Sequence, residues 1–331
     1  MGPLGSFRHT SHLLVKTAPD FQCIVCVKYH KKCGNCETGT VFLMHMGNLP
    51  EIAILLPIKN GENYVLSKIK SLQRQKYQNF KVLISVNIST DRTLGILSEL
   101  TRNDKRFIIY EQQIELSIAE NIAFLISKAQ TDLVLLTAVD DLVCENFLIE
   151  AIGLWTSFPN TQAVIALAKY EPPMHGDLPI CLELSCEKNQ RLRNLFNNIR
   201  VSHAMFYCLT TKDHLRKFSK KYPSEFVGRD WVFGIFTCLS GPVLTTMYSE
   251  ITFSVNGASR QPFYLFESAK SLTEKILPYG KMVREIIKMA QREGPRIRFL
   301  LYVFSAKLIL GNIRRFTRSL IDLILVEGRN S

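Results

Sequence analysis

Short apolar runs rich in β-branched residues recur through the middle of the chain. They lie at 52–58, 81–86, 107–110, 133–136 and 163–168. Apolar runs of this length, bounded by polar residues, are typical of strands that are buried on both faces. The segments between them carry apolar residues at helical spacing, at 63–75, 117–130 and 146–155. Strands that alternate with amphipathic helices predict an α/β fold with a mostly parallel sheet flanked by helices.

The first helical segment places Val65, Ile69 and Leu72 on one face. We expect this face to pack on the sheet, with basic residues such as Lys68 lying off it.

After about residue 170 the alternation stops. The Pro- and Gly-containing segment 170–179 predicts a loop or lid. Further on, 226–241 predicts a helix, and 242–248 and 250–255 predict two short strands. From residue 272 to the end the pattern is that of amphipathic helices.

The composition, 47% hydrophobic and 21% charged, is that of a globular protein and not of a disordered chain. The formal net charge is +12, and residues 281–331 alone hold eleven basic and four acidic side chains. This local excess predicts a polyanionic neighbour for the tail. No aromatic-interleaved binding motif accompanies it, so we do not expect a nucleic acid partner.

The first 48 residues differ from the rest. Residues 2–6, GPLGS, resemble the remnant of a cleaved expression tag. Two C-x-x-C pairs follow, and four thiolates can hold Zn²⁺. The cysteines are Cys23, Cys26, Cys33 and Cys36. Their six-residue gap is shorter than that of usual zinc sites, so the sequence favours a poorly ordered leader over a zinc knuckle.

The other five cysteines are scattered among apolar or helical segments, which is typical of reduced intracellular thiols. There is neither a signal-peptide pattern nor an uninterrupted apolar run of spanning length. We therefore expect a cytoplasmic protein.

Polar side chains follow three of the apolar runs. They are Pro57, Lys59, Asn60, Gly61 and Glu62 after the first run, Asn87, Ser89, Thr90 and Asp91 after the second, and Asp140 and Asp141 after the fourth. Each set alone matches an ordinary turn or helix cap. Parallel sheets bind ligands at the carboxyl ends of their strands, so together the three sets predict one cleft.

The stretch from 52 to 259 resembles family-2 glycosyltransferases of the GT-A fold, of the bacterial polysaccharide type. The matching motifs lie at 54–93, 133–148 and 227–259, in the order found in the family. The resemblance implies a nucleotide-diphospho-sugar transferase fold. It also implies transfer of a hexosyl group, with inversion, to a glycan or lipid-linked glycan.

The same resemblance divides the chain into three parts. They are a leader at 1–48, a GT-A domain at 49–260 and a basic helical extension at 261–331.

The resemblance also implies the residues that bind the nucleotide. They are Pro57, Asn60, Glu62, Asn87 and Asp91. Asn87 stands where the family has an acid that binds the base, usually uracil. An amide both donates and accepts hydrogen bonds, so it retains the ability to bind a base.

For the metal, the family motif implies that Asp140 and Asp141 hold Mg²⁺ or Mn²⁺ on the donor diphosphate. Ala138 replaces the first acid of the usual motif, which predicts weaker metal binding or loss of activity. His203 either completes the metal shell or is a hydrogen-bonded structural residue.

Asp230 matches the family's catalytic base, which takes the proton of the acceptor hydroxyl. We expect Arg229 to hold this carboxylate ionised. Trp231 either stacks on the acceptor sugar or belongs to the core.

The basic, apolar segment 296–318 predicts peripheral contact with the inner face of the plasma membrane. The alternative is a helix packed on the catalytic domain, with a solvated basic face. For the whole chain, the alternative function is a non-catalytic GT-A-like protein that binds a nucleotide sugar or a glycan.

Overall fold

The computed structural model describes residues 49–171, 180–184, 186–254, 274 and 277–327, together with three short strands nearer the N-terminus. Those three strands form an antiparallel sheet of their own in the order β1-β2-β3. They are β1 (Lys16–Ala18), β2 (Phe21–Val27) and β3 (Thr40–Met44).

The centre of the molecule is an eight-stranded sheet in the order β6-β5-β4-β7-β10-β9-β11-β8. The strands are β4 (Ile52–Ile58), β5 (Phe80–Val86), β6 (Phe107–Glu111), β7 (Leu133–Leu136), β8 (Leu142–Val143), β9 (Ala163–Glu171), β10 (Leu209–Thr211) and β11 (Val243–Ser254). All five predicted strands are present. The half β6-β5-β4-β7 is parallel, as expected, whereas β10 and β8 run antiparallel to their neighbours. The sheet is therefore mixed.

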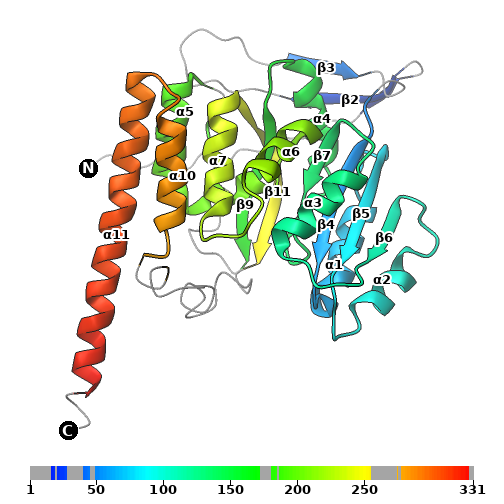
Figure 1. Cartoon of the computed structure of the whole chain (residues 1–331). Coiled ribbons are helices and arrows are strands. Elements are labelled where there is room, and N and C mark those ends of the chain that lie inside the picture. The colour runs from blue at the N-terminus through cyan, green and yellow to red at the C-terminus, as the bar shows by residue number, and fades with distance from the viewer. Residues whose placement is uncertain are drawn as a thin grey trace, which may run out of the picture.

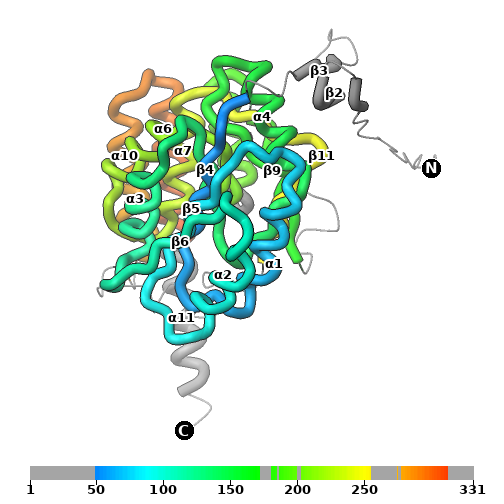
Figure 2. The backbone as a smooth tube through the Cα atoms, turned by 90° about the vertical axis from the view of Figure 1, so that its right-hand side faces the viewer, coloured from blue at the N-terminus to red at the C-terminus, as the bar shows by residue number. Residues whose placement is uncertain are grey.

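Helices cover both faces of the sheet (Figures 1 and 2). Figure 2 shows α3, α6 and α7 on one side and α1 and α4 on the other. They are α1 (Glu62–Gln73), α2 (Thr93–Thr101), α3 (Ile118–Lys128), α4 (Phe147–Ser157), α5 (Lys188–Asn197), the 3₁₀ helix η2 (Ile199–Phe206), α6 (Lys212–Lys221), α7 (Arg229–Ser240), α10 (Gly280–Ala290) and α11 (Pro295–Glu327).

The two short strands predicted at 242–248 and 250–255 are a single strand, β11. It pairs in parallel with β9, and the register shifts between Thr245 and Glu250. The buried Glu150 of α4 accepts hydrogen bonds from the backbone N–H of Tyr248 and from the Ser249 hydroxyl. Because this carboxylate satisfies the bulged residues, the chain stays in the sheet instead of leaving it as a turn.

At the C-terminal end of the described chain, α10 packs on α7, and the start of α11 packs on α10 and α5. Leu301 and Phe304 of α11 are buried, and the Phe304 ring stacks on Phe196 with 4.2 Å between centroids. Figure 1 shows the rest of α11 extending past the body of the molecule. Among the described helices, none combines the length and apolarity that crossing a membrane would need. The expected lid at 170–179 and the boundary at 260/261 lie largely outside the described residues.

Candidate active site

The carboxyl ends of β4, β5 and β7 lie side by side. Ile58 at the end of β4 pairs with Val86 of β5, and Leu55 of β4 pairs with Leu136, the last residue of β7. The three polar sets that follow these strands therefore lie at one edge of the sheet. The three sets lie at one edge, as the parallel pairing requires, and that they line one cleft stays a prediction.

At this edge the loop after β4 and the loop after β5 are joined by hydrogen bonds. The Asn60 side-chain oxygen accepts from the Thr90 N–H at 2.9 Å, and the Asp91 carboxylate accepts from the Glu62 N–H at 3.0 Å. The Glu62 carboxylate accepts in return from the Arg92 N–H at 3.0 Å. Three of the five residues predicted to bind the nucleotide thus hold the two loops together.

The Asp91 carboxylate also accepts from the N–H and the hydroxyl of Thr93. Burial alone would raise the pKa of Asp91, but these hydrogen bonds and the one from Glu62 outweigh it, so the pKa is lowered. Asp91 is thus held as a carboxylate by its own loop.

Asn87, only 5% exposed, pairs with the backbone of Leu116. Its side-chain N–H donates to the Leu116 carbonyl at 2.6 Å, and its oxygen accepts from the Leu116 N–H at 3.0 Å. A carboxylate has no proton to donate to that carbonyl, which explains physically why an amide suits this position. The predicted contact between Asn87 and a base stays a prediction, because here the amide is engaged by the protein itself.

Gly61 brings the first loop against the acidic loop 137–141. A Cβ at this position would lie 2.9 Å from Cγ2 of Ile58 and 3.3 Å from Cγ2 of Val139. A larger residue would require the Ile58 and Val139 side chains to shift, so this glycine supports the close approach of the first loop to the acidic loop.

The adjacent carboxylates Asp140 and Asp141 have different surroundings. Asp141 is buried, and its Oδ1 accepts from the backbone N–H of Ser254 at 3.2 Å, which ties the acidic loop to β11. Asp140 is half-buried, and its carboxylate takes part in no hydrogen bond with the described residues. Of the pair, Asp140 is the residue available to a ligand.

Lys68 lies on the buried face of α1 together with Val65, Ile69 and Leu72, so the expectation that it lies off that face is wrong. Positions 65, 68, 69 and 72 share one helix face, and the spacing alone was a signal that the sequence analysis missed. The ammonium donates to the Thr137 hydroxyl and to the Asp141 carbonyl, both at 2.6 Å.

The charge of Lys68 is set by two opposing effects. Burial lowers the pKa of Lys68 to about 8, although Asp141 and Asp140 act in the opposite direction. The side chain therefore remains mostly protonated at neutral pH.

The described residues contain no group of three or more His, Cys, Asp or Glu side chains that could hold a divalent cation. Mg²⁺ often binds through one or two carboxylates plus substrate phosphates and water. Asp140 fits a cation of that kind, one held largely by the donor diphosphate.

His203 lies in an aromatic cluster. Its Nε2 is 3.2 Å from the Tyr170 hydroxyl, and its ring meets Phe253 edge to face at 4.9 Å. These contacts match the structural alternative for His203. Its place in a metal shell stays a prediction.

Asp230 occupies the first turn of α7, directly after the left-handed Gly228 (φ 82°). A Cβ on Gly228 would collide with the sulfur of Met282, so α10 constrains this turn as well. Burial raises the pKa of Asp230 to about 6, although backbone N–H groups of the helix start lower it. A half-buried carboxylate with such a pKa is suited to accept a proton near neutral pH.

Arg229 points away from its neighbour. Its guanidinium donates to the Tyr222 carbonyl at 3.2 Å and lies over the Phe218 ring. It lowers the pKa of Asp230, as expected, but contributes less than burial does. Arg229 therefore anchors the helix more than it sets the charge of the carboxylate. Trp231 stacks on Tyr279 with 5.8 Å between centroids, which supports the expectation of a core role.

Tyr207 is a residue of this site that the sequence analysis missed. The pKa of its hydroxyl is raised well above the usual value, first by burial and then by Asp141, Asp140 and Asp230. The Tyr207 ring lies 5.7 Å from that of Phe253, whose neighbour Ser254 binds Asp141, so the phenol lies near the acidic loop. No sequence spacing links Tyr207 to either motif.

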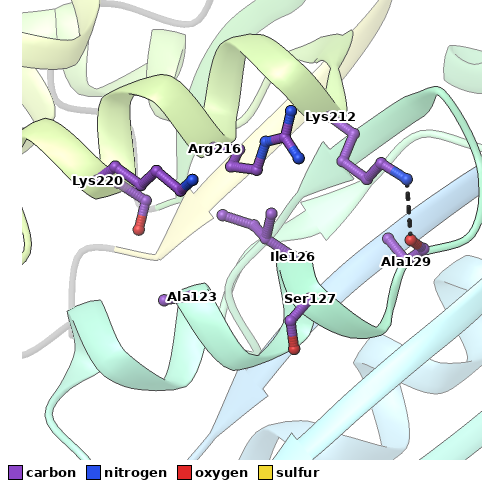
Figure 3. Close-up of a pocket in the computed structure, with 8 residues that line it drawn as sticks. Ala123, Ile126, Ser127, Ala129, Lys212, Arg216 and Lys220 are labelled. Atoms are coloured by element: carbon purple, nitrogen blue, oxygen red, sulfur yellow. Dashed lines mark hydrogen bonds between the residues drawn. The ribbon is translucent and has the colours of Figure 1, made fainter.

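A separate shallow pocket of about 340 Å³ lies between α3 and α6 (Figure 3). Lys212, Arg216 and Lys220 of α6 stand over Ile126 and Ala123 of α3. None of the predicted site residues lines it, so it is distinct from the carboxylate centre.

The zinc prediction is not tested. Cys23 and Cys26 fall on β2, while Cys33 and Cys36 lie outside the described residues.

Residues 53–208 match the family model of glycosyl transferase family 2. Over this segment the chain is similar to glycosyl transferase family 2. Two Haemophilus influenzae proteins, each named as an uncharacterized glycosyltransferase, are 30% identical to the chain over 101 and 77 residues. The matched regions span 40% and 24% of those relatives, less than half of either.

Solved structures confirm the GT-A fold around the family-2 segment. The S. aureus protein TarS 1–349, in complex with UDP-GlcNAc, has a TM-score of 0.53 and 13% identity, and the match covers 82% of this chain and 92% of that one. The mannosyltransferase PcManGT from Pyrobaculum calidifontis, in complex with GDP-Man and Mn²⁺, has a TM-score of 0.53 and 15% identity, with 86% and 77% coverage. At these identities the likeness concerns the fold.

Proposed function

We propose that this chain is a glycosyltransferase that moves a hexosyl group from a nucleoside-diphosphate sugar to a hydroxyl of a glycan or lipid-linked glycan in polysaccharide biosynthesis. The observation that carries the proposal is that the loops after β4, β5 and β7, which hold the predicted nucleotide and metal residues, lie at one edge of the sheet. The family-2 segment and the nucleotide-sugar complexes of proteins with the same fold support it.

The donor nucleotide would bind against the joined loops after β4 and β5. Asn60, Glu62 and Asp91 hold these loops in place, and Pro57 at the end of β4 forms part of the same wall. Asn87 then takes part in base binding either directly or by fixing Leu116 beside it.

Asp230 would act as the base. In its ionised form it accepts the proton of the acceptor hydroxyl as that oxygen attacks the anomeric carbon, which inverts the configuration there. A pKa near 6 leaves the carboxylate mostly ionised at neutral pH and still basic enough to take the proton.

Asp140 would hold Mg²⁺ or Mn²⁺ against the diphosphate, and a bound divalent cation neutralises charge on the leaving group. Asp141, tied to Ser254, would fix the acidic loop behind it. With Ala138 in place of a third acid, the protein supplies few of the ligands itself.

A calorimetric screen of UDP, GDP and dTDP, with and without Mn²⁺, tests the donor site. We expect one nucleotide to bind and Mn²⁺ to strengthen it. The absence of binding across all three would contradict the proposal. Donor binding without transfer or donor hydrolysis would instead support the alternative of a non-catalytic GT-A-like binding protein, to which the missing acid at Ala138 points.

We further propose that the chain contacts the cytoplasmic side of the plasma membrane, where a lipid-linked acceptor would lie. One face of α11 packs on the body, and the other exposes large apolar side chains. They are Phe299, Tyr302, Val303, Ile309 and Leu310. Arg296, Arg298 and Lys307 lie among them, so this surface combines apolar and cationic groups as interfacial helices do.

Vesicle sedimentation tests the membrane contact. We expect the chain to bind vesicles that contain phosphatidylglycerol and not purely zwitterionic ones, and Phe299→Ser with Leu310→Ser to weaken binding. Equal recovery with both vesicle types would argue for the other prediction, a packed helix with a solvated face.

A further inference from the structure

Lys68 is completely buried, which is rare for a lysine because moving an ammonium out of water is costly. It occupies a position on α1 where the neighbouring residues of the same face are Val65, Ile69 and Leu72. A leucine or methionine there would continue the apolar face. The presence of a charge therefore calls for a reason beyond packing.

The ammonium connects the two ends of the acidic loop. It donates to the hydroxyl of Thr137, directly after β7, and to the carbonyl of Asp141, directly before β8. Holding the loop is one role of Lys68, but a neutral donor would serve that role equally well.

Gln75, the second residue after α1, shows that a neutral side chain can do this. Its amide N–H donates to the carbonyl of Cys144 at 2.8 Å, and its oxygen accepts from the N–H of Leu148 at 3.2 Å. The same part of the chain thus holds the next segment with an uncharged amide. Lys68 and Gln75 therefore each brace a distant segment by hydrogen bonds, Lys68 with a charged side chain and Gln75 with a neutral one.

The charge of Lys68 is directed at the carboxylates. The ammonium donates to the hydroxyl of Thr137 and to the backbone carbonyl of Asp141 itself, so its charge lies against the loop that carries both carboxylates. Lys68 has no exposed surface, whereas Asp140 is half-buried. The site therefore contains a fixed positive charge before any metal binds.

We propose that Lys68 is a positioning residue whose ammonium serves as a built-in counter-charge for Asp140 and Asp141, so that this site holds a nucleoside diphosphate with a reduced demand for a divalent cation. The proposal rests on the donor site of the proposed function. Ala138 and Lys68 have the same effect on the loop. Ala138 removes one negative charge from it, and Lys68 adds one positive charge beside it, so both make the site less negative.

Lys68→Met, which keeps length and removes charge, tests this. We expect two effects of opposite sign, each roughly threefold to tenfold. Binding of UDP or GDP in EDTA becomes weaker, because the site is more negative. Binding of Mn²⁺ alone, followed by water-proton relaxation, becomes tighter for the same reason.

Gln75→Met is the matched control, since it removes a brace without changing the charge. We expect it to lower thermal stability and to shift both affinities in the same direction, if at all. A Lys68→Met variant that behaves like Gln75→Met would overturn the proposal and leave Lys68 as a structural brace.

Two further variants cover the case in which Lys68→Met does not fold. Lys68→Gln keeps a donor and removes the charge, and should reproduce the opposite shifts. Thr137→Val keeps the charge and removes one hydrogen bond, and should not. If the wild-type chain binds no nucleotide with or without Mn²⁺, the proposed function fails; if it binds and the opposite shifts are absent, the counter-charge proposal alone fails.

Discussion

Two regions of polar side chains at the same edge of the sheet differ in how their hydrogen bonds are used. In the loops after β4 and β5, the side chains of Asn60, Glu62 and Asp91 are paired with backbone N–H groups. Around Tyr207, by contrast, burial and nearby carboxylates raise the pKa of the phenol, burial raises the pKa of Asp230, and Asp140 makes no hydrogen bond to the described residues. The first region is a preorganised scaffold, and we propose that the second holds the groups that react or bind.

This comparison explains why similar side chains at strand ends should respond differently to substitution. Removing a residue of the scaffold leaves backbone groups without partners and costs stability. Replacing a carboxylate near Tyr207 removes a partly buried charge and its repulsion by neighbouring charges. We therefore expect such a variant to lose activity and not stability. The following predictions test this division.

The largest effect is expected for Asp230→Asn. Without a base, transfer should fall by about 10²–10⁴-fold, the usual contribution of a positioned general base. Donor affinity should be unchanged, which isothermal calorimetry would show. Unchanged turnover in the variant would remove Asp230 from the mechanism.

The same residue predicts the pH dependence. The folded pKa of Asp230, about 6, lies above its usual value of 3.8, so ionisation opposes folding and stability is lost as the pH rises through 6. At pH 8, Asp230→Asn should therefore have a melting temperature a few degrees above that of wild type. At pH 4 the two proteins should melt at the same temperature. In wild type, kcat should fall as the pH drops below 6, because the base becomes protonated.

Asp140→Asn should come next. Loss of its charge should weaken Mn²⁺-dependent donor binding on the order of 10–100-fold, with little change in melting temperature. Asp141→Asn is the comparison, since its oxygen is hydrogen-bonded to Ser254 inside the protein. If Asp141→Asn has the larger effect on Mn²⁺ and the smaller one on stability, the assigned roles of the pair are reversed.

Asn87→Asp introduces the acid that the family pattern has at this position. It tests whether the hydrogen bonds of the scaffold contribute to stability. It replaces a donor to the Leu116 carbonyl by a carboxylate, so we expect a loss of about 1–3 kcal/mol in the free energy of unfolding. Urea unfolding measures it. Asn79→Asp, which removes a more exposed hydrogen bond to the Leu49 carbonyl, is the control and should cost less.

The smallest effect is expected for Arg92→Ala. Its side chain is 84% exposed and lies 3.4 Å from the Glu62 carboxylate, so the ion pair should contribute about 0.5 kcal/mol or less. The backbone N–H of Arg92, which also binds Glu62, is retained in the variant. A loss above 1 kcal/mol in urea unfolding would show that the scaffold depends on charge and not on its backbone hydrogen bonds.

Much of this site was predictable from local pattern. Apolar runs ending in polar residues located the loops after β4, β5 and β7, since the carboxyl ends of parallel strands meet at one edge. The helix that carries Asp230 was also predictable from its spacing. What the pattern did not reveal is which polar groups are engaged, because hydrogen-bond partners such as Leu116 or Ser254 lie far away in the sequence.

Two errors have the same cause. Lys68 was expected off the buried face of its helix because lysine is seldom buried, and the segment before Glu250 was expected to divide two strands. In both cases a distant group satisfies the polar atoms, Thr137 and Asp141 for Lys68 and Glu150 for the bulge in β11. Such compensation is a long-range property that residue preferences do not contain.

The sequence by itself therefore determined the strands of the parallel half, the helices between them, and the two acidic motifs, because these depend on short-range periodicity and on chain direction. Only the tertiary structure decided that Tyr207 lies near the acidic loop, that Lys68 donates to Thr137 and Asp141, and that Asn87 is held by Leu116. Burial and electrostatic interaction depend on distances in space, and those distances are set when β7, α1 and α7 pack together.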